Sequence, residues 1–142
     1  MSRALYNRIM AKIERLDEYL GYLKLLQRVN KKSFLEDYHN FGLAERYLQL
    51  TIEVTLDIAK MLVTERGLPK PESNQEFFAV LHDAKILSKK TTETLQGTIG
   101  FRNVLVHDYE KIDRAVVYEK LQTRFDDFLA FRKEVLKYLK KQ

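Results

Sequence analysis

The sequence predicts an all-α fold, an antiparallel bundle of about five helices in a single domain over residues 1–142. Three observations support this fold class. Apolar residues recur at three- and four-residue spacing along most of the chain, as one face of an α-helix requires. No segment shows the apolar and polar alternation of a half-buried strand. Capping signals and a Gly-Leu-Pro stop divide the helical pattern into segments with short connections, which favour antiparallel neighbours.

The first two helices carry the clearest patterns. The first is expected over residues 3–29, with an apolar stripe at spacings of 4, 4, 3, 4 and 3. That stripe consists of Leu5, Ile9, Ile13, Leu16, Leu20 and Leu23. The second helix is expected to open with a capping box from Ser33 to Glu36 and to end at Arg66, before Gly67. Because apolar residues cover more than half of its circumference, the second helix is predicted to lie at the centre of the bundle.

A narrow polar line crosses the apolar surface of that second helix. It consists of Arg46, Gln49, Glu53 and Asp57, at spacings of 3, 4 and 4. These residues can form a solvated face with ion pairs. Alternatively, Glu53 or Asp57 supplies the carboxylate that pairs with Arg102 across the bundle, since a buried guanidinium must be compensated.

The remaining helices follow from their capping signals. A second capping box begins at Ser73 and opens a third helix that should run to about Leu87. Thr91 or Thr92 is expected to start the fourth helix, and Asp113 to cap the fifth. The predicted inward-facing residues of the third and fifth helices are Phe77, Val80, Leu81, Ala84, Val117, Leu121, Phe125, Phe128 and Val135.

Composition limits the class of protein. With 142 residues and 45% hydrophobic content, the chain can bury roughly two-thirds of its unfolded surface and needs no disulfide or metal to fold. It contains no cysteine, which fits a cytoplasmic protein and excludes thiol chemistry. No stretch resembles a signal peptide or a membrane span. The net charge of +5 points to an anionic partner, although the basic carboxyl-terminal segment can serve solubility alone.

Several catalytic motifs are absent from the sequence. There is no glycine-rich phosphate loop, no paired-histidine zinc motif and no nucleophilic-serine elbow. The three histidines, His39, His82 and His107, lie on different predicted elements without metal-ligand spacing. Any chemistry is therefore expected to proceed without a metal or a cofactor.

The candidate site lies near the end of the fourth helix. Leu95, Ile99, Val106 and Tyr109 follow a rhythm of four and three residues whose missing member is Arg102. An arginine on such a seam either extends its charge to solvent or meets a carboxylate.

A second, polar stripe runs beside this seam and contains Gln96, Gly100, Asn103 and His107. Arg102 and His107 diverge by roughly 140° on an ideal helix, at about 100° per residue. The long arginine side chain, or a helix that ends near His107, must close that gap. Taken alone, His107 could simply interact with the helix C-terminus, and Tyr109 could be a core residue.

An arginine and a histidine without a metal suit the cleavage of RNA by its own 2′-hydroxyl. Imidazole, with an ordinary pKa of about 6.5, can take or return a proton near neutral pH. A guanidinium can stabilise the charge on the transition state at phosphorus. Because one histidine does not easily act as base and acid at once, we expect a symmetric homodimer that brings two copies of the site together.

Arg102, His107 and Tyr109 form an Arg-x4-His-x-Tyr pattern, with Asn103 directly after the arginine. This pattern resembles the signature of the HEPN superfamily, and its flanking residues are similar to those of the HepT toxin subfamily. Segments 44–49 and 52–59 of the second helix also resemble that subfamily's central helix. The similarity therefore extends over the helix order of the chain.

The resemblance implies a metal-independent ribonuclease that acts as the toxin of a toxin–antitoxin pair. Its antitoxin would be a minimal nucleotidyltransferase of the MntA type, bound in a hetero-oligomer. The resemblance further implies that Arg102 and His107 are the catalytic pair and that Asn103 is a positioning residue. It also implies that the antitoxin transfers AMP from ATP to Tyr109. Attached AMP would put bulk and negative charge where the RNA phosphate should lie.

Two other functions remain open on the residues alone. The chain could be a non-catalytic helical subunit that presents substrate or nucleotide to a nucleotidyltransferase, with Arg102 and His107 binding a phosphate. It could also be a dimerisation or adaptor bundle, in which Arg102 forms a structural ion pair and His107 is a helix-end residue.

Overall fold

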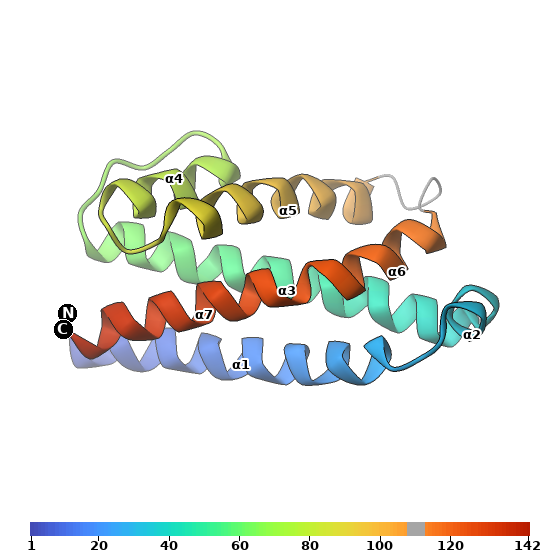
Figure 1. The fold of residues 1–142 in the computed structure, drawn as a ribbon. Coiled ribbons are helices and arrows are strands. Elements are labelled where there is room, and N and C mark those ends of the chain that lie inside the picture. The colour runs from blue at the N-terminus through green and yellow to red at the C-terminus, as the bar shows by residue number, and fades with distance from the viewer. Residues whose placement is uncertain (108–112) are drawn as a thin grey trace.

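A computed structural model describes the backbone of residues 1–107 and 113–142, and the side chains of residues 1–102 and 113–142. Seven helices and no strand occur in this described part of the chain (Figure 1). They are α1 (Arg3–Gln27), α2 (Lys31–Glu36), α3 (Tyr38–Glu65), α4 (Asn74–Asp83), α5 (Lys89–His107), α6 (Arg114–Thr123) and α7 (Phe125–Lys140). The predicted all-α fold class is confirmed.

The four longest helices, α1, α3, α5 and α7, form the body of the bundle (Figure 1). Short α2 turns the chain between α1 and α3 at one end, and α4 lies against α3 and α5 toward the other end. The two termini lie together at that second end. Helix α3 contacts α1, α2, α4, α5 and α6, which confirms its predicted central place.

The core follows the predicted periodicity closely. Five of the six residues in the α1 stripe are buried, and Leu5 at the helix start is half-buried. The predicted inward-facing residues of α6 and α7 are all buried as well. Fully buried Phe34, Phe78, Phe128 and Phe131 supply the largest side chains of the core. Among the described helices, none combines the length and apolarity that crossing a membrane requires.

The predicted second helix is divided in two at Asp37. This residue is extended, with φ −99° and ψ 108°, and its carboxylate accepts a hydrogen bond from the backbone N–H of His39 at 2.8 Å. The predicted capping box at Ser33 is wrong, because Asn30 caps α2 by accepting from the Ser33 N–H at 2.8 Å. Two strong capping residues within one apolar pattern therefore produce two helices.

The end of α3 agrees with the prediction. Gly67 adopts the left-handed conformation with φ +64°. The N–H of Leu68 donates to the carbonyl of Val63 at 3.1 Å, and the N–H of Gly67 donates to that of Thr64 at 3.1 Å. This pair of bonds is a Schellman motif, which satisfies the carbonyl groups at the helix end.

Other boundaries differ from the predictions. Helix α4 ends at Asp83 rather than Leu87, because Lys85 adopts a positive φ of 63° and the N–H of Ile86 bonds to the carbonyl of Leu81 at 2.9 Å. A non-glycine residue in this conformation leaves no clear signal in the sequence. Helix α5 begins at Lys89, before the predicted threonines.

The predicted fifth helix is also divided, in this case at Arg124, with φ −101° and ψ −5°. Asp113 caps α6 as predicted, since its carboxylate accepts from the N–H of Ala115 at 2.8 Å. No side-chain hydrogen bond caps the start of α7. The apolar stripe continues through the break, so the sequence pattern alone does not reveal it.

Candidate active site

Helix α5 is anchored at its start, far from the candidate catalytic residues. The hydroxyl of Ser88 accepts from the N–H of Thr91 at 3.2 Å, and the Thr91 hydroxyl donates to the carboxylate of Glu134 on α7. Further along, Leu95 and Ile99 are buried in the bundle. These contacts fix the rotation of α5 and therefore the direction in which Arg102 leaves it.

Arg102 meets a carboxylate of α3. Its Nη2 lies 3.5 Å from Oε1 of Glu53, and the two side chains are 23% and 34% exposed. Glu53 Oε1 also accepts a hydrogen bond from Nε2 of Gln49 at 3.2 Å. A guanidinium that is largely removed from water requires such a partner. The predicted carboxylate for Arg102 is therefore supplied by Glu53.

Arg102 retains unused hydrogen-bonding capacity. Its Nε is buried and has no hydrogen-bond partner among the described residues. Glu53 engages one end of the guanidinium, at a distance longer than a strong charge-assisted bond of about 2.7–2.9 Å. Because the Arg102 side chain is 23% exposed, outer N–H groups of its planar guanidinium can reach the oxygens of a phosphate.

Asp57 lies in a different contact. Its Oδ2 is 3.2 Å from Nζ of Lys12 on α1, and both side chains are nearly half exposed. Arg46, at the other end of the predicted polar line, is exposed. The line on α3 is thus partly a solvated face, as one interpretation held. Among the ion pairs of the described residues, only that of Glu53 joins this polar line on α3 to α5.

Three predicted site residues have side chains outside the described part of the chain. The backbone of α5 continues through Asn103 to His107, so both residues share a helix with Arg102. Tyr109 lies outside the described residues altogether. The catalytic role of His107, the positioning role of Asn103 and the modification of Tyr109 therefore stay predictions.

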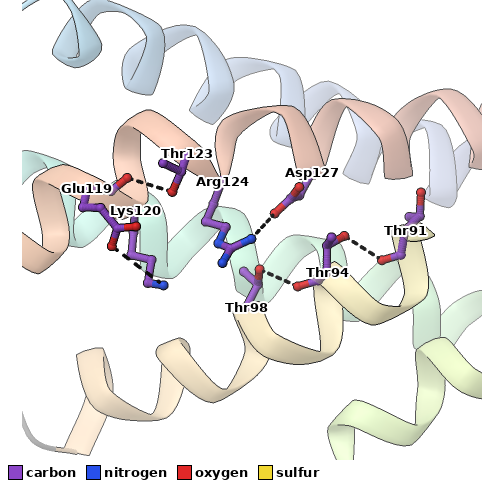
Figure 2. A network of polar contacts seen from close by, with 8 residues as sticks. All are labelled: Thr91, Thr94, Thr98, Glu119, Lys120, Thr123, Arg124 and Asp127. Carbon is purple, nitrogen blue, oxygen red and sulfur yellow. Dashed lines mark hydrogen bonds and ion pairs between the residues drawn. The ribbon is translucent and has the colours of Figure 1, made fainter. Parts of the chain in front are cut away.

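The structure also brings Lys120 and Arg124 beside α5, which the sequence reasoning did not foresee. Figure 2 shows both side chains directed from α6 and its C-terminal end toward α5. They line a cavity of about 140 Å³ together with Leu48, Ile52, Gly97, Thr98, Phe101 and Phe128. A signal was present, because the two cations share one face of a helix with the core residues Val117 and Leu121.

Asp127 stands next to this cavity and faces Arg124. Its Oδ2 lies 3.6 Å from Nη1 of Arg124 (Figure 2). Burial raises the pKa of the Asp127 carboxyl group above its usual range, and the nearby Arg124 opposes that rise. The protonated, neutral form of Asp127 is therefore more favoured than that of an aspartate on the surface.

A wider groove lies between α1 and α3, with a volume of about 910 Å³. Its lining includes Glu53 and Asp57, the cations Arg8, Lys12, Arg15 and Lys60, and apolar residues such as Leu50 and Met61. Glu53 therefore has one side toward Arg102 and another toward this open groove.

Comparison with known proteins decides the family. The family model of HepT-like ribonucleases matches residues 9–135, which is most of the chain. The chain belongs to the HepT-like ribonuclease family. The match covers α3, α5 and the Arg102 region, so the helices that carry the candidate site are those of a HepT-like protein.

Individual HepT-like relatives agree with this assignment. A tRNA nuclease HepT from Aphanizomenon flos-aquae is 25% identical over 131 residues, which cover 92% of this chain and 89% of the relative. An mRNA nuclease HepT from Shewanella oneidensis is 29% identical over 84 residues, or 59% of this chain and 63% of the relative.

Solved structures show the same fold. The tri-AMPylated HEPN toxin of Shewanella oneidensis, in complex with the MNT antitoxin, has a TM-score of 0.78 and 23% sequence identity, with 96% of this chain and 99% of that chain covered.

Proposed function

We propose that this HepT-like protein is an endoribonuclease toxin that cleaves RNA without a metal, through Arg102 and His107, in the cytoplasm. The observation that carries the proposal is the guanidinium of Arg102, which Glu53 holds on the seam of the bundle with part of its hydrogen-bonding capacity unused. Relatives that are named as tRNA and mRNA nucleases support RNA as the substrate class.

In the proposed reaction, His107 of one protomer takes the proton of the RNA 2′-hydroxyl. That oxygen attacks the adjacent phosphorus, the bond to the 5′-oxygen breaks, and a 2′,3′-cyclic phosphate forms. Arg102 pairs with the phosphate oxygens as charge builds up on them. The 5′-oxygen leaves with a proton from a second acid, which in the proposed homodimer is the protonated His107 of the other protomer.

The need for that second acid supports a homodimer. A histidine that acts as the base must be neutral, whereas one that acts as the acid must be protonated, so one imidazole serves as base and acid in turn rather than together. A two-fold axis near α5 would place a second His107 opposite the first. Asn103 would then position substrate, while Glu53 holds Arg102. Asp57 pairs with Lys12 instead and is given no part in holding Arg102.

The antitoxin is proposed to be a minimal nucleotidyltransferase that silences the enzyme by attaching AMP to Tyr109. The AMPylated HEPN toxin with its MNT antitoxin supports this proposal, because its fold is the fold of the present chain. An attached phosphate diester adds negative charge beside the site and opposes the approach of an RNA phosphate.

Cleavage of a defined RNA by the purified protein in EDTA tests the nuclease. We expect new ends that carry a 2′,3′-cyclic phosphate, and we expect His107→Ala and Arg102→Ala to lose this activity with unchanged melting temperatures. His39→Ala is the matched control, since His39 is exposed at the start of α3. An adaptor function would instead predict no cleavage by wild type and unfolding of Arg102→Ala.

Mass spectrometry after co-expression with the proposed cognate nucleotidyltransferase tests the modification. We expect AMP on wild type and on Tyr38→Phe, whose side chain is 70% exposed, but not on Tyr109→Phe. The modified protein should lose RNA cleavage. AMP on another tyrosine, or full activity of the modified protein, would contradict the proposed regulation.

A further inference from the structure

The cavity beside α5 has an apolar floor and a polar mouth. Its floor consists of Leu48, Ile52 and Phe128, which are at most 2% exposed. The mouth is formed by Gly97, which is exposed, and by Lys120 and Arg124, whose side chains are 26% and 39% exposed. Pockets for organic ligands share this organisation, in which apolar walls bury the ligand and a few polar groups orient it.

The size of the cavity selects its ligand. Its volume is about 140 Å³. An apolar cavity of about 150 Å³ is known to accept a benzene ring. One six-membered aromatic ring therefore fills the cavity, whereas the second ring of a purine would extend into its mouth.

The rim provides contacts for an aromatic ring with an attached anion. Nζ of Lys120 lies 6.0 Å from the centre of the Phe101 ring, so a cation and an aromatic face border the opening together. Aromatic side chains stack on nucleobases. The Thr98 hydroxyl donates to the Thr94 carbonyl at 2.9 Å (Figure 2), which leaves its oxygen free to accept a bond from a ligand N–H.

Both rim cations are only loosely paired within the protein. Lys120 Nζ lies 3.9 Å from a carboxylate oxygen of Glu119, and Arg124 Nη1 lies 3.6 Å from one of Asp127. These distances exceed a hydrogen bond of about 2.7–3.2 Å. Each cation can therefore turn toward a ligand phosphate without the loss of a strong bond.

The cavity and the candidate active site are formed by the same stretches of α3 and α5, although neither Glu53 nor Arg102 lines the cavity. Ile52 of its floor precedes Glu53, and Phe101 of its rim precedes Arg102. The two residues that form the ion pair are thus direct chain neighbours of two cavity residues.

We propose that this cavity binds one pyrimidine base of the RNA substrate, with the adjoining phosphate on Lys120 and Arg124, and so sets a sequence preference for cleavage. The apolar floor and Phe101 take the ring, and Thr98 meets its polar edge. This inference rests on the proposed ribonuclease function, because RNA is the polymer that would present the base.

Closing the mouth with Gly97→Leu tests the proposal. A Cβ atom at Gly97 would meet nothing within 4 Å, so a leucine can be built on the helix without a clash, at a position that lines the cavity. Gly21→Leu on α1 is the matched control, since a Cβ there also meets nothing within 4 Å and the residue lies away from the cavity.

Binding of free nucleotides gives a readout that needs no cleavage. We expect uridine 5′-monophosphate to bind at least about tenfold more tightly than adenosine 5′-monophosphate or inorganic phosphate, as measured by NMR titration. Gly97→Leu should lose that preference, and Gly21→Leu should retain it. The base-binding role would be overturned if wild type bound all three probes equally. It would also be overturned if Gly97→Leu kept the same preference for uridine monophosphate as Gly21→Leu.

Sequencing of cleavage products gives the second readout. Wild type should cut next to pyrimidines, and Gly97→Leu should cut without that preference. Lys120→Gln should weaken uridine monophosphate binding, while Lys133→Gln, a control on α7 outside the cavity lining, should not. If RNA is not cleaved but uridine monophosphate still binds as expected, the ribonuclease function fails and the cavity assignment stands.

Discussion

Glu53 on α3 and Arg102 on α5 form an ion pair, with 3.5 Å between Oε1 and Nη2. This contact joins the central helix to the helix that carries the candidate site. Because Gln49 also donates to Glu53, the carboxylate is held from two directions. Arg102 is therefore positioned by α3 before any substrate arrives.

Removal of the Glu53 charge should slow RNA cleavage more than it affects folding. In Glu53→Gln the guanidinium loses its counter-charge and its fixed direction, and misplacement by about 1 Å can cost up to about 100-fold in rate. The free energy of unfolding should change by about 1 kcal/mol or less, since both side chains are partly exposed. Cleavage kinetics and urea denaturation measure the two quantities.

Asp57→Asn is the control for that prediction. Asp57 lies on the same face of α3 but pairs with Lys12 at a nearly half-exposed position. Its cleavage rate should stay within about twofold of wild type, as expected for a surface ion pair. Equal rate losses in the two variants would show that Glu53 has no special role toward Arg102.

Arg102→Lys should not preserve the rate of RNA cleavage. Lysine keeps the positive charge but cannot bind two phosphate oxygens with a planar fork. We expect cleavage at least about tenfold slower than wild type, and about 100-fold or more slower in Arg102→Ala. Single-turnover cleavage rates provide the measurement. Wild-type rates in Arg102→Lys would mean that charge alone suffices.

Asp127 should make the protein less stable as pH rises. Burial raises the pKa of its carboxyl group in the folded state, so the folded protein holds that proton more strongly than the unfolded chain does. The contribution of this group to stability is present below the unfolded pKa of about 3.9 and is lost as pH rises through the higher folded pKa.

Denaturation with urea at several pH values tests this linkage. Asp127→Asn should reduce the fall in unfolding free energy above pH of about 4, whereas Asp83→Asn, at an exposed position on α4, should retain it. A direct NMR titration of Asp127 should place its pKa above the usual range. If the unfolding free energy fell with pH equally in Asp127→Asn and wild type, Asp127 would not be the cause of that fall.

Two glycines should respond in opposite directions to alanine. Gly67 has φ +64°, where a Cβ is strained, so Gly67→Ala should lower the unfolding free energy by about 1 kcal/mol or more. Gly21 lies within α1 and has open space around it, so Gly21→Ala should raise that energy by about 0.5–1 kcal/mol. Chemical denaturation of both variants checks the pair.

The sequence predicted the helices better than their ends. The buried stripe of α1, the central place of α3 and the cap at Asp113 all follow from local rules of spacing and capping. The breaks at Asp37 and Arg124 were missed, because the apolar pattern runs through both. The positive φ of Lys85 was missed because the usual signal for that conformation is glycine.

For the candidate site too, some features follow from the sequence and others depend on how the helices pack. By itself the sequence determined which residue types stand along α5, because helical spacing and side-chain chemistry are local properties. The contacts of these residues depend on the tertiary structure. There Arg102 pairs with Glu53 rather than Asp57. Lys120 and Arg124 lie at the edge of the cavity beside α5. Such contacts depend on the rotation and offset of packed helices, which no local spacing specifies.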